Sequence, residues 1–78
     1  MNDSQTLASL KPGTRGVVTE IRIPVEQRAR LLEMGLLVGT IIELVRFAPM
    51  GDPVEIRVRG YNLSLRKHEA ELVMVRQS

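Results

Sequence analysis

A change of structural period within residues 30–40 constrains the fold of this 78-residue chain more than any other feature. Residues 25–34 are rich in good helix formers and predict a short helix, whereas residues 40–47 form a β-rich run and predict a strand. Gly35 suits a left-handed helix cap, and Gly39 suits the turn that leads into the strand. The remaining strands are therefore expected to be arranged around this helix–turn–strand unit.

Short strands and tight turns account for most of the remaining sequence. Apolar and charged residues alternate at residues 54–59, which predicts a strand with one buried face and one solvent-facing side. Further strands are predicted at residues 15–22, 63–66 and 72–75, with a tight reversal at 60–62 and one helical turn at 67–71. Five short strands with one inserted helix predict a mainly β fold, a small and strongly bent barrel. The glycines expected at structural turns are Gly13, Gly35, Gly39, Gly51 and Gly60.

The length of the chain permits one small domain, which we place at residues 7–76. Residues 1–6 are polar, and we expect them to form a flexible N-terminus. No apolar run approaches the ~20 residues needed to span a bilayer, and the N-terminus lacks a signal-peptide pattern. These features predict a cytoplasmic protein that does not span a membrane.

The side chains available leave little room for catalysis or metal binding. The chain has no cysteine, no recognisable nucleophile motif and no phosphate-cradling glycine-rich loop, so we predict no enzyme activity and no cofactor. His68 and Glu71 lie three residues apart and are weak metal candidates. A solvated turn is the preferred interpretation, because a closed metal site takes about four protein ligands.

Nucleic-acid binding is the alternative from a different functional class. Arg57, Arg59 and Arg66 could serve a small nucleic-acid-binding barrel. The net charge is only +2, and Phe47 and Tyr61 are the only aromatic residues available for base stacking. We therefore expect no nucleic-acid partner and interpret the arginines mainly as a solvated face.

Exposed apolar residues point to a protein partner. Leu31 and Met34 share one face of the predicted helix, whereas Leu32 points about 100° away in an ideal helix. The sequence leaves open whether Leu32 completes the core or is exposed. Met50 lies beside Pro49 in a loop at residues 48–53, and we expect it to be exposed because loops run over the surface. The hypothesis for the partner-binding patch comprises Arg28, Leu32, Pro49 and Met50.

Three segments together resemble the FeoA family, the ferrous iron transport protein A family. They are RARLLEMGLLVGT at residues 28–40, APMGDP at 48–53 and LSLR at 63–66. The family has an arginine-rich helix ending in Leu-Gly-Leu/Met, then Pro-Gly, an Ala-Pro-x-Gly-Asp-Pro loop and a Leu-x-Leu-Arg strand. The likeness covers about residues 7–75. One departure is Val38, which stands where the family commonly has proline.

The resemblance implies an SH3-like barrel and a role in bacterial ferrous iron uptake without enzyme activity. It also implies a partner, the membrane transporter FeoB, which carries a cytoplasmic GTP-binding domain. Our first hypothesis is therefore a cytoplasmic interaction module that binds and modulates FeoB. Direct transition-metal binding or delivery is a further alternative that the poor ligand inventory disfavours. The sequence leaves weak self-association open.

Overall fold

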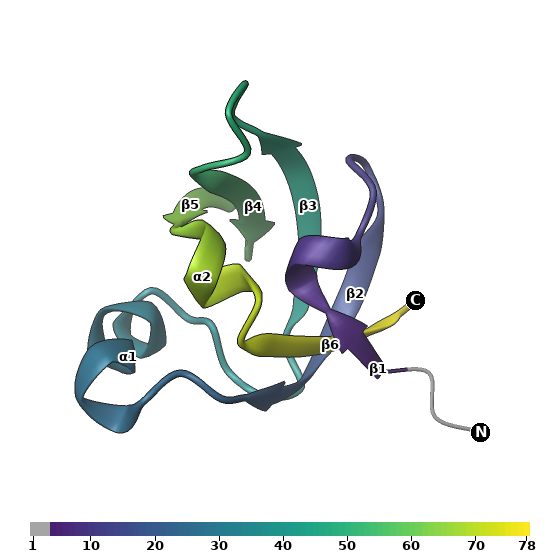
Figure 1. Ribbon diagram of the computed structural model, residues 1–78. Helices are drawn as coiled ribbons and strands as arrows, with labels where there is room; N and C mark the ends of the chain where they lie inside the picture. Colours follow the sequence, from purple (N-terminus) through teal and green to yellow (C-terminus); the bar gives the residue numbers. More distant parts are fainter. Residues whose placement is uncertain (1–3) are drawn as a thin grey trace.

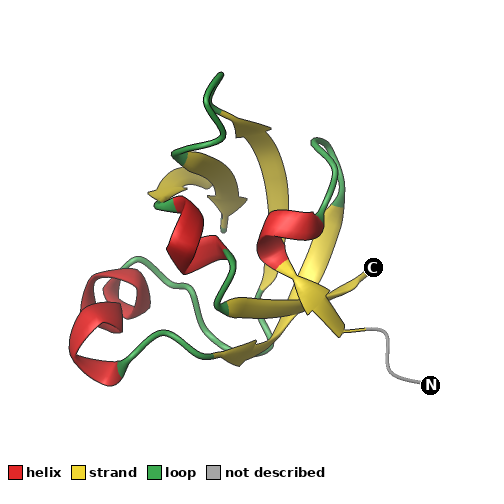
Figure 2. Cartoon of the chain, in the orientation of Figure 1, coloured by secondary structure: helices red, strands yellow, loops and turns green. Residues whose placement is uncertain are grey.

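The computed structural model describes residues 4–78, in which six strands, two α-helices and one 3-10 turn are present (Figure 1). The strands are β1 (Ser4–Thr6), β2 (Arg15–Ile21), β3 (Ile41–Phe47), β4 (Val54–Val58), β5 (Tyr61–Leu65) and β6 (Val73–Gln77). The helical elements are η1 (Leu7–Ser9), α1 (Val25–Glu33) and α2 (Lys67–Ala70). Figure 2 shows α1 joined to the strands by a loop on each side, whereas η1 and α2 lie close to the strands.

All six strands belong to one antiparallel sheet with the order β1-β6-β2-β3-β4-β5. The register shifts between Val18 and Glu20 where β2 pairs with β6, and between Leu44 and Arg46 where β3 pairs with β4. Such bulges bend a strand and increase its twist, which curls the sheet into a barrel shape. The end strands β1 and β5 are not hydrogen-bonded to each other within residues 4–78, so the barrel is open along this line. The predicted mainly β, SH3-like fold with an inserted helix is confirmed, with this opening as a difference.

The strand count of five was wrong, because Ser4–Thr6 forms the additional strand β1. It pairs with β6, and Gln5 lies opposite Val75 in the register. The predicted flexible N-terminus, residues 1–6, thus ends in a strand, and its residues 1–3 lie outside the described residues. A three-residue polar edge strand has no alternation to detect, and its partner comes from the other end of the chain.

The hairpin between β4 and β5 turns earlier than the sequence predicted. Val58 pairs with Tyr61, so the turn consists of Arg59 and Gly60 instead of residues 60–62. Both turn residues have positive φ, +52° for Arg59 and +89° for Gly60, which is the geometry of a type I′ turn. Such turns usually carry Asn-Gly or Asp-Gly, so an arginine at the first position concealed the signal.

A single aliphatic core fills the curved sheet. Fully buried side chains come from widely separated elements, including Leu7 in η1, Leu44 in β3, Ile56 in β4, Leu65 in β5 and Ala70 in α2. The helical elements η1 and α2 contact each other and cover the inner side of the sheet (Figure 1). The barrel is therefore filled by its own side chains, and binding has to take place on its outer surfaces.

The C-terminus of α1 ends in a Schellman motif. The Leu36 N–H donates to the Leu31 carbonyl at 3.0 Å, and the Gly35 N–H donates to the Leu32 carbonyl at 3.0 Å. Gly35 has a φ of +95°, which a residue without Cβ adopts readily. Leu31 and Leu36 are both fully buried, so the motif also sets the hydrophobic contact that docks α1 on the barrel.

A second turn, at residues 37–40, leads from α1 towards β3. The Thr40 N–H donates to the Leu37 carbonyl at 3.0 Å, and Gly39 has a φ of +93°, which indicates a type II turn with Val38 at its second position. Proline is favoured at this position because its ring presets the required φ. Val38 is 63% exposed, and within residues 4–78 its N–H donates no hydrogen bond.

Val38→Pro is therefore expected to raise the free energy of unfolding by ~0.4–1 kcal/mol, because it restricts the unfolded chain without removing a contact. Thermal unfolding should show a midpoint higher by a few degrees, since ~1 kcal/mol shifts the midpoint of a domain of this size by about 4–8 °C. Val38→Ala is the control, because it removes the side chain without fixing φ. A lower midpoint for Val38→Pro would contradict the turn assignment.

Candidate functional site

The outer face of α1 presents an apolar strip to solvent. Val25 and Leu32 lie seven residues apart, two helical turns, and are 68% and 40% exposed. Arg28 and Ala29 lie between them on the same side of an ideal helix, whereas Leu31 points to the core. The open question about Leu32 is thus resolved in favour of exposure. We call this strip, Val25, Arg28, Ala29 and Leu32, the helix patch.

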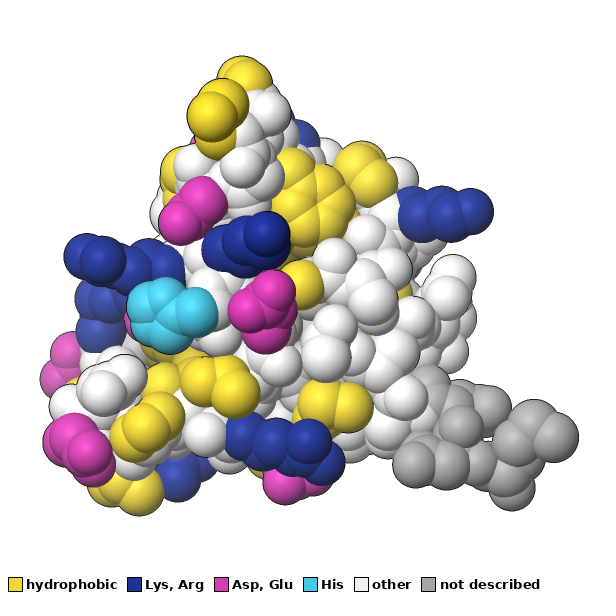
Figure 3. All heavy atoms as spheres, viewed as in Figure 1, with side chains coloured by type: hydrophobic (Ala, Val, Ile, Leu, Met, Phe, Trp, Pro, Cys, Tyr) yellow, Lys and Arg dark blue, Asp and Glu magenta, His cyan; other side chains and the backbone are white. Residues whose placement is uncertain are grey.

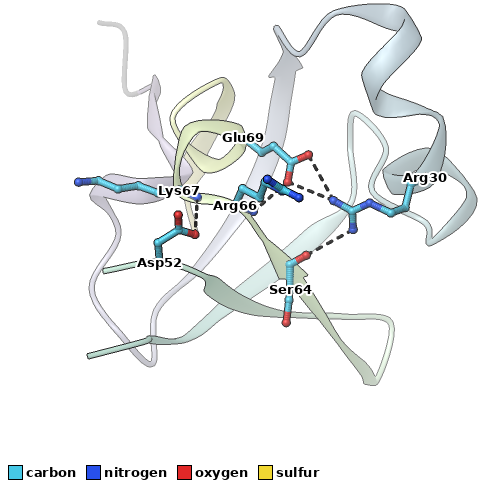
Figure 4. Close-up of polar contacts among 6 residues, drawn as sticks. All are labelled: Arg30, Asp52, Ser64, Arg66, Lys67 and Glu69. Atoms are coloured by element: carbon cyan, nitrogen blue, oxygen red, sulfur yellow. Dashed lines mark hydrogen bonds and ion pairs between the residues drawn. The ribbon is translucent and has the colours of Figure 1, made fainter. Parts of the chain in front are cut away.

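Polar contacts from α1 to the barrel hold this strip in place. The Arg28 guanidinium is half-buried and donates to the Ile21 carbonyl at the end of β2, at 3.2 Å. The Arg30 guanidinium donates to both carboxylate oxygens of Glu69, at 3.1 and 3.2 Å (Figure 4). The Tyr61 hydroxyl donates to the Met34 carbonyl at the end of the helix. The helix patch therefore has a defined orientation relative to the sheet.

Glu69 connects α1 to α2. Its side chain is only 8% exposed, and besides Arg30 it accepts a hydrogen bond from the Arg66 N–H at 2.8 Å. The next N–H, that of Lys67, donates to the Asp52 carboxylate at 3.0 Å (Figure 4). A helix N-terminus leaves its first N–H groups without intrahelical partners. At α2, two of these groups donate to carboxylates, one to Glu69 in α2 itself and one to Asp52 in the loop before β4. No local pattern predicts this role of Glu69, because Glu69 lies 39 residues from Arg30.

The other apolar surface lies at the tip of the loop between β3 and β4. Met50 is 91% exposed, as expected, and Pro49 beside it is exposed as well. Figure 1 places this loop and α1 at opposite ends of the molecule. Figure 3 shows hydrophobic side chains at both ends and charged side chains gathered between them. The four residues predicted as one partner-binding patch therefore occupy two separate surfaces, Arg28 with Leu32 and Pro49 with Met50.

The arginines of the nucleic-acid hypothesis are also separated. Arg57 and Arg59 line a shallow cavity on the outer face of the sheet together with Arg15. Arg66 precedes α2 and lies beside Glu69 and Arg30 (Figure 4). Arg15 was not among the residues predicted for this site, because its closeness to Arg57 results from strand pairing and not from a local pattern.

The described part of the chain offers little for metal or catalytic chemistry. His68 and Glu71 are exposed at α2, and no group of three or more His, Cys, Asp or Glu side chains that could hold a metal ion occurs within residues 4–78. None of the helices in this range is long and apolar enough to cross a membrane.

Two ion pairs alter protonation equilibria at the surface. The hydrogen bond from Arg22 lowers the pKa of the Glu20 carboxyl, and the hydrogen bond to Glu55 raises the pKa of Arg46. The Arg22–Glu20 distance is 3.0 Å and the Arg46–Glu55 distance is 3.1 Å. Both pairs lie outside the helix patch, and exposed pairs of this kind are common on protein surfaces.

Comparison with protein families and with curated proteins points to the same family. A family model described as the FeoA domain matches residues 5–77. A protein of Porphyromonas gingivalis, named Fe(2+) transport protein A/Fe(2+) transporter FeoB fusion protein, is 38% identical over 69 residues. The aligned region covers 88% of the present chain and 8% of the fusion protein, so the chain corresponds to a small part of that relative.

Comparison with solved structures agrees with these matches. The solution structure of the FeoA protein from Chlorobium tepidum has a TM-score of 0.89 and 38% identity, and the match covers 94% of this chain and 70% of that one. A manganese-dependent transcriptional repressor has a TM-score of 0.86 at 15% identity, over 100% of this chain and 38% of the repressor. The likeness to the repressor shows a shared fold alone.

Proposed function

The chain belongs to the FeoA family, and from this premise we propose that it is an accessory protein of ferrous iron transport that binds and modulates a FeoB-type transporter. The proposed partner region is the GTP-binding domain on the cytoplasmic side of the membrane. The role is one of binding, without catalysis by the chain itself.

The observation that carries this proposal is the FeoA–FeoB fusion in P. gingivalis, whose sequence includes a segment 38% identical to this chain. Joining two modules in one chain holds them at a high effective concentration, up to the millimolar range for short linkers. Such a fusion is useful when the two modules act on each other. The surface of the FeoA-like domain is then expected to contact the transporter part.

We assign the docking contact to the helix patch. An amphipathic helix whose apolar side is free can lie in a groove of a partner, with anchor residues spaced at i, i+4 and i+7. Val25, Ala29 and Leu32 have this spacing, and Arg28 adds a charged group at their edge. Pro49 and Met50 form a second, smaller contact at the other end of the molecule. A partner can touch this contact and the helix patch simultaneously only if it extends around the barrel.

Leu32→Asp is expected to weaken binding to the cytoplasmic domain of the transporter by roughly tenfold or more, because it places a charge in the centre of an apolar contact. Isothermal titration or a quantitative pull-down measures this change. Met50→Asp is the matched variant at the other surface, and we expect a smaller effect because Pro49 and Met50 form the smaller of the two proposed contacts.

Circular dichroism and thermal unfolding establish that both variants keep the fold. A folded Leu32→Asp protein with unchanged affinity would overturn the helix patch as the docking site. If both variants bind normally and the wild-type chain also leaves the GTP hydrolysis rate of the domain unchanged, the proposed modulation of the transporter is wrong.

A further inference from the structure

A shallow cavity of about 150 Å³ lies on the outer face of β2, β3 and β4, away from the helix patch. Its lining combines positive charge with aliphatic surface. The residues that line it are Arg15, Ile41, Ile42, Glu43, Arg57 and Arg59. The lining thus contains three arginines and one glutamate, and Ile41, which also lines the cavity, is 58% exposed.

The strand register explains why these charges gather. Arg15 lies opposite Glu43 across β2 and β3, and Glu43 lies opposite Arg57 across β3 and β4. The three side chains therefore form one row across the outer face of the sheet. Within residues 4–78, none of the three cavity arginines forms an ion pair, although Nε of Arg57 donates to the Asn62 side chain at 3.4 Å. The cavity keeps unneutralised positive charge available to a ligand.

The third arginine of the cavity lining, Arg59, has an unfavourable backbone conformation. Arg59 occupies the first position of the type I′ turn with a φ of +52°, a region that residues other than Gly, Asn and Asp rarely adopt. Its side chain passes Gly35, with Cδ 3.6 Å from the position that a Cβ of Gly35 would occupy. This is an ordinary contact distance, so the Arg59 side chain lies directly beside the end of α1.

We propose that this cavity binds carboxylates of an acidic segment of a protein partner, with Ile41 contacting an aliphatic residue next to them. Guanidinium groups donate paired hydrogen bonds to carboxylates, and the positive charge of the cavity complements an acidic segment. The proposal rests on the proposed function in taking the occupant to be a protein. A nucleic-acid strand fits less well, because the cavity lining contains no aromatic ring for base stacking.

The test is an NMR titration of the full chain with a short synthetic peptide in which glutamates and aspartates flank one leucine. We expect the largest amide shifts at Arg15, Ile41, Arg57 and Arg59, and an affinity that falls as NaCl is raised. A peptide with glutamine and asparagine in the acidic positions should not bind. The double variant Arg57→Gln/Arg59→Gln should weaken binding of the acidic peptide by roughly tenfold.

The control variant is Lys11→Gln/Lys67→Gln, which removes the same number of positive charges outside the cavity and should change the affinity less than about twofold if the effect is local. Equal weakening by both double variants, or shifts that centre elsewhere, would overturn the site. Equally tight binding of inorganic phosphate, or tighter binding of a single-stranded RNA oligonucleotide at the same residues, would overturn the assignment to an acidic protein segment.

The two proposals fail in different ways. If the acidic peptide binds but the transporter domain does not, the cavity assignment stands and the proposed function falls. If the domain binds with the same affinity to wild type and to Arg57→Gln/Arg59→Gln, and the peptide does not bind, the cavity assignment falls while the proposed function stands.

Discussion

Leu31→Ala is expected to lower the free energy of unfolding by about 2–5 kcal/mol, the range for large-to-small changes at fully buried leucines. Leu31 is 0% exposed and is the only buried residue of α1. It also forms the hydrophobic contact of the Schellman motif with Leu36. Its truncation removes most of the apolar attachment of the helix and leaves a cavity beneath it. Urea unfolding followed by circular dichroism measures the loss.

The neighbouring substitution Leu32→Ala is the matched control. Leu32 is 40% exposed, so the same chemical change should cost less than about 1 kcal/mol. Because a small domain has only about 5–15 kcal/mol of stability in total, the two variants should be well separated in their urea midpoints. Equal midpoints would show that α1 is not docked through Leu31, and the orientation of the helix patch would lose its basis.

Local sequence patterns predicted the elements of the fold because the physical cause of each lies within a few residues. The three-residue spacing of Leu31 and Met34 marks the inner face of α1, and the alternation at Val54–Val58 marks a half-buried strand. Gly35 and Gly39 predicted a cap and a turn because only a residue without Cβ adopts these backbone angles easily. Such local signals can be recognised in a single sequence.

Features that depend on distant partners could not be predicted in this way. Strand β1 exists only because β6 offers it an edge, and Arg15 meets Arg57 only through the pairing of three strands. The exposure of Met50 follows from its place in a loop, whereas the exposure of Leu32 was left open by the sequence, and the separation of the two follows from the curvature of the whole sheet (Figure 1). The surface chemistry of single residues was therefore easier to predict than the grouping of residues into a site.

The position of α1 connects these findings, because both proposed surfaces depend on it. The helix patch lies on α1 itself, and Arg59 reaches the cavity along Gly35 at the end of α1. Within residues 4–78, the ion pair that links α1 to the rest of the chain is Arg30–Glu69. A change at Glu69 should thus affect stability and both surfaces together.

Glu69→Ala is expected to lower the free energy of unfolding by about 2–3 kcal/mol. The reason is that the carboxylate is 8% exposed and accepts from the Arg66 N–H at 2.8 Å and from Arg30 at 3.1 and 3.2 Å. Its removal leaves the Arg66 N–H without a partner at the start of α2, whereas the half-exposed Arg30 keeps part of its hydration. Thermal and urea unfolding measure the loss, and hydrogen exchange in α1 shows whether the helix loosens first.

Two further variants separate the hydrogen bond from the charge. Glu69→Gln keeps an acceptor for the Arg66 N–H but loses the ion pair with Arg30. It should therefore lower the free energy of unfolding by about 1 kcal/mol, which is less than the loss expected for Glu69→Ala. Glu71→Ala removes an exposed carboxylate two residues later and should stay within about 0.5 kcal/mol of wild type. If Glu69→Ala and Glu71→Ala unfold alike, Glu69 does not hold α1 and α2 together, and the defined orientation of the helix patch must come from Leu31, the Schellman motif and the other polar contacts of α1.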